Sequence, residues 1–219
     1  MTRTLLALCA CTLTLGGCVH ATRAEYPRHY VLGDPVQTLQ ENRDASKPGE
    51  MILQITRIGV PEWLEGTAMY YRLDYQHDGR LSAYGHSDWI APPATLLEPL
   101  VQAAIAAGGS WRAVLGPGIP ARADASLQLR LDDFSQRFQQ PDRSVGVLDA
   151  TATLIDHHGD RVVAQKRFHI EVAASTPDAQ GGAQALGEAG RQFAVQVQHW
   201  LTTMTASAPP SPSGSDGHE

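Results

Sequence analysis

Long segments with alternating character in the second half of the chain place the strongest constraint on its fold. Apolar and polar residues alternate through 127–131, a pattern that runs on towards Phe134 and Phe138, and again through the later part of 163–172. A period of two is typical of strands with one buried face. Residues 145–155 form a third segment of this kind, and the polar link 156–160 is typical of a hairpin. We therefore expect three long strands here.

Shorter patterns precede these strands. Residues 30–32, 51–58, 67–76, 81–84 and 111–115 each read as a strand bounded by glycine, proline or polar residues. The sequence 77–80, His-Asp-Gly-Arg, favours a turn, so 67–76 and 81–84 are expected to form a hairpin.

Two apolar stripes at helical spacing predict two amphipathic helices. Ser87 and Asp88 offer an N-cap for the first helix, and Pro92 and Pro93 suit its start. Its stripe comprises Leu96, Leu97, Leu100, Val101, Ala104 and Ile105, and that of the second comprises Leu186, Gly190, Phe193, Ala194, Val197, Trp200 and Leu201. A mostly antiparallel sheet with both helices on one face would bury all these stripes. We predict an α/β fold of the α+β type, forming a single domain over residues 25–204.

The N-terminus resembles the signal of a bacterial lipoprotein. After a polar start come about eleven apolar residues, fewer than the roughly 20 that a helix needs to cross a bilayer. The sequence 15–18, Leu-Gly-Gly-Cys, looks like a lipobox, which implies removal of residues 1–17 and acylation of Cys18. Two or three acyl chains hold a protein stably on a membrane. The alternative is a cleaved export signal with a chance cysteine.

The residue after Cys18 is Val19 rather than aspartate, which in the enterobacterial sorting pattern implies transport to the outer membrane. Residues 18–24 are expected to form a lipidated tether. Residues 205–219 are rich in Ala, Pro, Ser and Gly, and we predict a disordered tail there.

Charge and cysteine content exclude several functions. The formal net charge is -6, without a basic cluster, so nucleic acid is not an expected partner. Cys9, Cys11 and Cys18 all lie within the first eighteen residues, so the predicted domain has no cysteine for a disulfide, a zinc site or a thiol nucleophile. An acidic domain gains nothing from anionic lipid headgroups, so attachment to a membrane must come from lipid on Cys18.

Patterns that could carry catalysis are weak. His86, Ser87 and Asp88 are the residue types of a catalytic triad, but adjacent residues cannot form its chain of hydrogen bonds. Asp132 and Asp133 would face opposite sides of an extended strand, so they would not act as a carboxylate pair. We expect no enzyme.

Cofactor and metal motifs are equally weak. Asp156, His157, His158 and Asp160 include metal-ligand types, but neighbouring histidines in a hairpin link point apart. The glycine groups lack the spacing of dinucleotide or phosphate loops. We expect neither a metal nor a cofactor.

An ordered set of short motifs resembles the ABC-type transport auxiliary lipoproteins of the PqiC/YmbA kind. After the lipobox come Tyr30-x-Leu32, Val60-Pro61-x-Trp63-Leu64, Met69-Tyr70-Tyr71-Arg72, Ser87-x-Trp89 and Pro92-x-x-x-Leu96. The strand 127–131 followed by Phe134 and Arg137, and a last helix ending in Trp200-Leu201, are similar too. The tail after Met204 departs from the compact ending of such proteins.

This resemblance implies a non-catalytic accessory to an MCE-type lipid transport system. Its partners would be an inner-membrane MCE-domain protein with its ABC permease and ATPase. The lipoprotein would sit on the periplasmic face of the outer membrane and dock the far end of the conduit. Partners of a tubular conduit are often ring-like, so the resemblance also implies a homo-oligomer as a candidate assembly of this protein.

If docking is the function, five residues are candidate contacts, because aromatic residues and arginine dominate interface energetics. They are Trp63, Leu64, Tyr71, Arg72 and Trp89. The alternative is that these residues only pack the sheet against its helices.

Two other functions fit the anchor. One is a periplasmic lipoprotein hydrolase, which a deep polar pocket around His86, His169 or His199 would favour. The other is a lipoprotein that regulates outer-membrane or cell-wall assembly.

Overall fold

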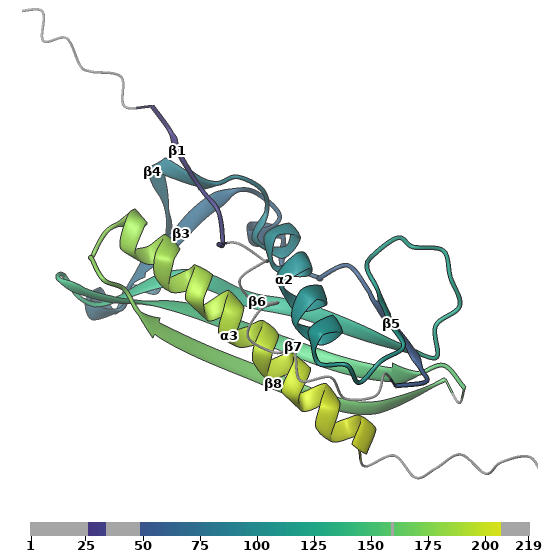
Figure 1. The fold of residues 1–219 in the computed structure, drawn as a ribbon. Coiled ribbons are helices and arrows are strands. Elements are labelled where there is room, and N and C mark those ends of the chain that lie inside the picture. Colours follow the sequence, from purple (N-terminus) through teal and green to yellow (C-terminus); the bar gives the residue numbers. More distant parts are fainter. Residues whose placement is uncertain (1–25, 34–48, 159, 207–219) are drawn as a thin grey trace, which may run out of the picture.

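The computed structural model describes residues 26–33, 49–158 and 160–206. In this part of the chain, an eight-stranded sheet forms one layer and two helices, α2 (Pro93–Ala107) and α3 (Ala179–Ala206), form the other (Figure 1). The expected α+β architecture with both helices on one face is therefore confirmed. The predicted signal, tether, Cys18 and most of the tail lie outside the described residues.

Three long strands form the frame of the sheet. They are β6 (Ala125–Gln140), β7 (Arg143–Asp156) and β8 (Arg161–Ala173). β6 pairs with β7 and β7 with β8, both antiparallel, so the predicted hairpin at 156–160 is confirmed. The alternating segments of the sequence account for these strands because each buries one face under the helices.

The other edge of β6 holds two strands, one after the other. β2 (Ile52–Ile55) pairs with its first residues and β3 (Ala68–Leu73) with its last part, both parallel to it. Between them, the 3-10 turn η1 (Glu62–Leu64) keeps the chain beside the same edge. Outside β2 lies β5 (Ala113–Leu115), and outside β3 lie β4 (Leu81–Trp89) and β1 (Arg28–Tyr30).

The expectation of a mostly antiparallel sheet is wrong. Four of the seven pairings between the described strands are parallel: β1–β4, β2–β5, β2–β6 and β3–β6. A parallel pair needs a long crossover connection, and the segment containing α2 supplies it between β2 or β3 and β6. Periodicity reveals that a segment is a strand, but not the direction of its neighbour.

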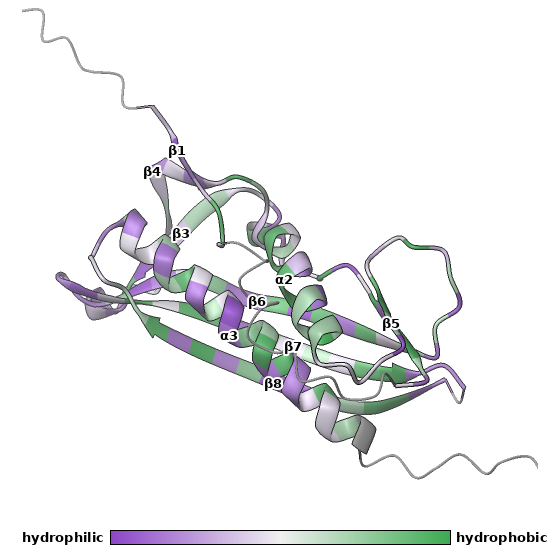
Figure 2. Ribbon diagram, in the orientation of Figure 1, coloured by the Kyte–Doolittle hydropathy of each residue, from purple (hydrophilic) through white to green (hydrophobic). Residues whose placement is uncertain are grey.

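The core lies between the sheet and the helices. Figure 2 shows apolar residues on the sides of α2 and α3 that face the sheet, and alternating character along β8. Leu53, Leu127, Leu148, Leu97 and Phe193 are among its fully buried residues. Gly146 of β7 lies where α3 approaches the strand closely, since a Cβ there would meet the backbone nitrogen of Leu186 at 2.8 Å.

Several predicted boundaries move. Ser87 and Asp88 do not cap α2, because both belong to β4 and pair with β1, and the N-cap is Pro92. The hairpin at 77–80 is confirmed, but β3 ends at Leu73 and the 3-10 turn η2 (Asp74–Gln76) follows. Among the described residues, no helix has the length and apolar character needed to cross a membrane.

Candidate functional site

The side of the sheet away from the helices is polar. Asp149, His169 and Glu171 form a chain of contacts on it, with distances of 2.6 Å from Asp149 to the His169 ring and 3.2 Å from that ring to Glu171. The side chains that we call the polar face come from β3, β6, β7 and β8 and include Arg72, Gln128, Arg130, Asp132, Asp133, Ser135, Arg137, Asp149, Thr151, Thr153, Gln165, His169 and Glu171.

A β-bulge places two carboxylates on this face. The register of β6 and β7 shifts between Leu131 and Asp133, so β6 holds one extra residue there. Asp132 accepts a hydrogen bond from Nε of Arg130 at 2.7 Å, while Asp133 contacts Ser135 and Arg137 farther along the strand. The expectation that the two aspartates face opposite sides is therefore wrong, because the bulge interrupts the alternation.

Asp133 is the centre of a buried polar network. Its side chain accepts hydrogen bonds from Oγ of Ser135 at 2.7 Å and from Nη2 of Arg137 at 2.6 Å. Ser135 is fully buried and Asp133 is 5% exposed. Burial by itself lowers the pKa of Arg137, but the hydrogen bond with Asp133 and the negative charges of Asp133, Asp74 and Asp149 together outweigh it, and the pKa is raised. The guanidinium of Arg137 is thus held in one orientation and stays charged.

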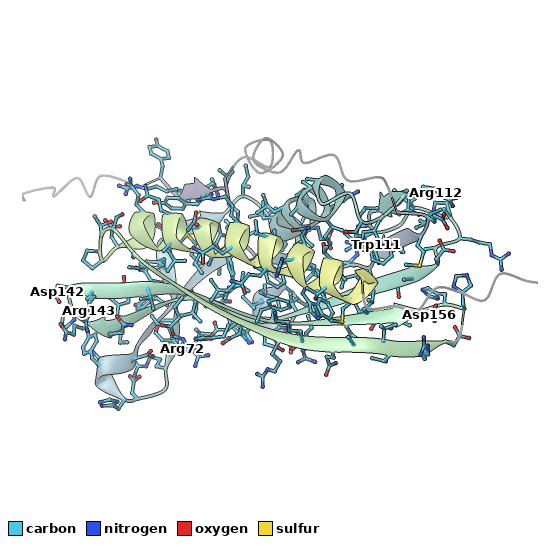
Figure 3. All side chains as sticks on the ribbon, turned by 60° about the horizontal axis from the view of Figure 1, so that its bottom comes forward. Arg72, Trp111, Arg112, Asp142, Arg143 and Asp156 are labelled. Atoms are coloured by element: carbon cyan, nitrogen blue, oxygen red, sulfur yellow. The ribbon has the colours of Figure 1, made fainter. Side chains whose placement is uncertain are left out.

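Arg72 lies beside Arg137 without a carboxylate of its own. The two are register partners on the parallel strands β3 and β6, so their side chains share the polar face. Within the described part of the chain, Arg72 makes no side-chain hydrogen bond or ion pair, and its Nε is buried without a partner. Figure 3 shows Arg72 on the side of the sheet away from α3, nearer to Asp142 and Arg143 than to Asp156.

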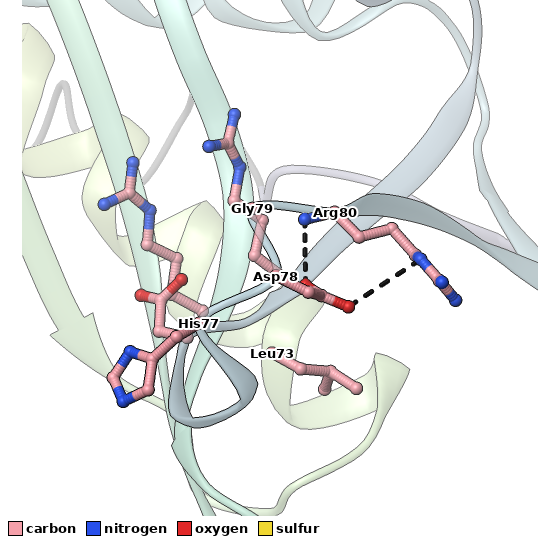
Figure 4. Close-up of a pocket in the computed structure, with 8 residues that line it drawn as sticks. Leu73, His77, Asp78, Gly79 and Arg80 are labelled. Atoms are coloured by element: carbon pink, nitrogen blue, oxygen red, sulfur yellow. Dashed lines mark hydrogen bonds and ion pairs between the residues drawn. The ribbon is translucent and has the colours of Figure 1, made fainter.

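Both arginines line a cavity of about 420 Å³ at the β3–β4 hairpin (Figure 4). We call it the arginine cavity; its walls are formed by Arg72, Leu73, Asp74, His77, Asp78, Gly79, Arg80 and Arg137. His77 and Gly79 have positive φ angles of 55° and 66°, which lets the hairpin turn sharply. Arg80 donates its backbone N–H to Asp78 and faces the same carboxylate at 3.8 Å. It is therefore already paired, whereas Arg72 is not.

The five predicted contact residues do not form one surface. Leu64 and Trp89 are each 1% exposed, and Trp89 packs on Phe134 with ring centroids 5.5 Å apart. These two belong to the core.

The other three predicted contacts are partly exposed. Trp63 packs edge-on against Tyr70, with ring centroids 5.2 Å apart, beside the strand that carries Arg72. Tyr71 faces the helix side, where its ring lies 4.7 Å from that of Tyr84. Only Arg72 lines the arginine cavity.

Sequence reasoning considered Asp133 only as one half of a carboxylate pair, and it missed the network of Asp133 with Ser135 and the placement of Arg137 in this cavity. The signal was the spacing Asp133-x-Ser135-x-Arg137, which puts three polar residues on one face of a strand. This spacing indicates a site only when β3 is known to lie beside β6, because that pairing brings Arg72 next to Arg137.

Residues considered for catalysis or metal binding are dispersed. His86, His169 and His199 are exposed, and Ser87 is buried beside His86 in β4. The pKa of His169 is raised, chiefly by its hydrogen bond with Asp149. His158 contacts Asp156 and Asp124, yet no group of three or more His, Cys, Asp or Glu within the described ranges is arranged to hold a metal ion.

Two crystal structures share this fold. That of protein XCC0632 from Xanthomonas campestris is 20% identical, with a TM-score of 0.65, and the match covers 75% of this chain and 91% of that one. The structure of an uncharacterized protein is 15% identical, with a TM-score of 0.62 and coverage of 81% and 99%. At these identities the likeness shows the fold alone. No curated protein sequence matches the chain significantly.

The family comparison extends beyond the fold. The profile described as "ABC-type transport auxiliary lipoprotein component" matches residues 30–198, which include every element from β2 to β8, α2 and most of α3. Lipoproteins of this kind are anchored to a membrane of the cell envelope. The chain therefore belongs to the ABC-type transport auxiliary lipoprotein family.

Proposed function

We propose that this protein is a non-catalytic accessory lipoprotein of an MCE-type ABC system that moves lipid between membranes. The observation that carries the proposal is the family match over residues 30–198, together with the lipobox that ends at Cys18. An auxiliary role is consistent with exposed, dispersed histidines rather than an enclosed catalytic group. The domain bounds 25–204 and the tether 18–24 belong to the same proposal.

Lipidation at Cys18 would hold the domain at the periplasmic face of the outer membrane. The test is expression of the wild-type chain and a Cys18→Ser variant in the native host, followed by separation of the two membranes by density. We expect acylated wild type in the outer-membrane fraction and unprocessed variant elsewhere. Wild type in the inner-membrane fraction would contradict the location, and an unacylated wild type would contradict the anchor.

Docking of the MCE-domain protein would use the partly exposed members of the predicted contact set. Trp63 packs on Tyr70 beside Arg72, which belongs to the polar face, and Tyr71 lies on the opposite face of β3. Leu64 and Trp89 contribute through packing, because their side chains are buried. An aromatic residue beside an arginine with no ion pair is a typical energetic centre of an interface.

The docking test compares matched substitutions in the lipidated protein. Trp63→Ala and Arg72→Gln are each expected to lower capture of the MCE-domain protein about tenfold or more, as for interface residues of high energy. Tyr26→Ala and Arg112→Gln are the controls, since Tyr26 precedes β1 and Arg112 precedes β5, and both side chains are exposed. Circular dichroism checks folding. Equal capture by all four variants would contradict this docking surface.

A further inference from the structure

The pairing of Arg72 with Arg137 leaves a positive charge unbalanced. Like charges directly opposite each other on neighbouring strands destabilise a sheet. The carboxylate of Asp133 balances the charge of Arg137, and its other oxygen already accepts a hydrogen bond from Ser135. No carboxylate within the described ranges forms an ion pair with Arg72. Two neighbouring guanidinium groups with only one carboxylate between them repel each other, and this repulsion favours the binding of an anion beside Arg72.

Partial burial sharpens this argument. The Nε atoms of Arg72 and Arg137 are both shielded from solvent and have no hydrogen-bond partner. Water therefore cannot fully solvate these guanidinium groups, and a nearby negative charge is worth more here than at an open surface. Arg72 bears most of the free-energy cost of this incomplete solvation, because Arg137 has its hydrogen bond with Asp133.

The arginine cavity has the size and lining for a small oxyanion. Its volume of about 420 Å³ lies within the range of small-molecule sites. Guanidinium groups match the geometry of phosphate oxygens, and two of them side by side present several parallel donors. His77 and Gly79 also line the cavity, and Leu73 contributes an apolar side chain to the lining.

We infer that the arginine cavity binds a phosphate-type oxyanion, with Arg72 as the main charge partner and Arg137, oriented by Asp133, as the second. The phosphate of a lipid headgroup and free phosphate share this chemistry. The assignment to a headgroup rests on the proposed transport function, whereas the anion site rests on the arginine geometry alone.

Asp74 supplies an internal control on this inference. Its carboxylate lines the same cavity and attracts Arg137 electrostatically, but within the described residues it forms no ion pair with either arginine. It would repel an entering anion. Asp74→Asn should therefore strengthen anion binding, the opposite of the effect of Arg72→Gln.

The test is calorimetric titration of the mature lipidated protein in detergent micelles, with protein-free micelles as background. The probes are inorganic phosphate and dihexanoyl phosphatidylglycerol. We expect saturable binding that Arg72→Gln weakens about tenfold or more, as for loss of a charge-assisted contact. Asp74→Asn should tighten it. The matched control is Arg80→Gln, which removes the same charge from the same cavity. Because Arg80 is already paired with Asp78, this substitution should change the affinity for the probe less than about twofold.

The outcomes separate the two proposals. Binding of phosphatidylglycerol supports the headgroup assignment, and binding of phosphate alone supports the anion site but overturns that assignment. Binding of neither probe, or equal binding by wild type and Arg72→Gln, overturns the site. If neither probe binds and Arg72→Gln still abolishes capture of the MCE-domain protein, Arg72 recognises a protein carboxylate and only the docking proposal survives. If Arg72→Gln loses probe binding but captures the MCE-domain protein normally, the anion site is supported and Arg72 is not a docking contact.

Discussion

Arg137 reaches back along its own strand to Asp133, four residues earlier, and donates a hydrogen bond of 2.6 Å to its carboxylate. The Cα atoms of residues i and i+4 of a strand are about 13 Å apart, so this contact needs a side chain as long as that of arginine. Ser135, between them on the same face, donates to the other carboxylate oxygen at 2.7 Å. This network fixes the wall of the arginine cavity.

Removing Arg137 should destabilise the fold. Arg137→Met would leave the Asp133 carboxylate, only 5% exposed, without its charged partner. We expect the free energy of unfolding to fall by about 2–3 kcal/mol, the cost of an unsatisfied buried charged group, as measured by urea denaturation.

The control is the exposed pair of Arg130 with Asp132, whose side chains are 68% and 31% exposed. Arg130→Met should cost less than about 1 kcal/mol because solvent screens this pair. Adding Asp133→Asn to Arg137→Met should recover part of the loss. Equal losses for the two arginines would show that the Asp133 network does not stabilise the fold.

Gly146 should be required for close packing of α3 on β7. A Cβ at this position would meet Leu186 N at 2.8 Å and the carbonyl carbon of Ala185 at 2.9 Å, and backbone atoms cannot move aside singly. We expect Gly146→Ala to lower the free energy of unfolding by about 1–3 kcal/mol, as for overpacking of a core. Gly85→Ala, where a Cβ meets nothing within 4 Å, should change it by less than about 0.5 kcal/mol. Similar behaviour of the two variants in thermal denaturation would contradict this account.

Tyr84 should stabilise the fold through Gln136 on the helix side. Its hydroxyl donates to Oε1 of the fully buried Gln136 at 2.8 Å, and the amide nitrogen of Gln136 donates to Ser144 at 2.7 Å. Burial raises the pKa of Tyr84, so the hydroxyl stays protonated and remains a donor. Tyr84→Phe should cost about 1–2 kcal/mol because it leaves the Gln136 oxygen unpaired. Tyr75→Phe is the matched control, because the Tyr75 hydroxyl only accepts a long, exposed hydrogen bond of 3.5 Å from Gln76; a loss of the same size there would refute the argument.

His169 should make a small, pH-dependent contribution. Its hydrogen bond with Asp149, and a weaker one with Glu171, raise its pKa above the ordinary value. A raised pKa in the folded state gives stability that is complete below the unfolded pKa of about 6.5 and is lost as pH rises through the folded pKa. The side chain is 57% exposed, so screening limits the effect to about 1 kcal/mol.

The measurement compares melting temperatures of wild type and His169→Gln. We expect a difference of at most about 2–4 °C near pH 5.5 that shrinks near pH 8.5. His199→Gln, another exposed histidine and one for which no histidine–carboxylate pair is described, is the control. A difference that grows with pH would have the wrong sign for this mechanism.

Much of the local structure was predictable from sequence. The stripe from Leu96 to Ile105 predicted α2, and alternation from Leu127 to Leu131 predicted β6, because helical and extended backbones bury residues at different periods. The order of short motifs also pointed to the family that the profile confirms. Local patterns succeed where a segment buries its apolar residues against a single neighbour layer.

The candidate site was only partly predictable. Arg72 was identified from its residue type and its aromatic neighbours, and it lines the arginine cavity. Trp89 was identified by the same reasoning, yet it is a core residue packed on Phe134. An aromatic side chain is as suited to a core as to an interface, and only its surroundings decide between the two.

The sequence by itself determined which segments become helices and strands, where the hairpin at 77–80 turns, and the N-terminal motif that ends at Cys18. The tertiary structure alone decided that β3 lies parallel beside β6, that a bulge turns Asp132 and Asp133 to one face, and that Arg72 stands next to Arg137. Register and strand direction depend on backbone hydrogen bonds between residues far apart in the chain. Such bonds leave no periodic trace in either segment.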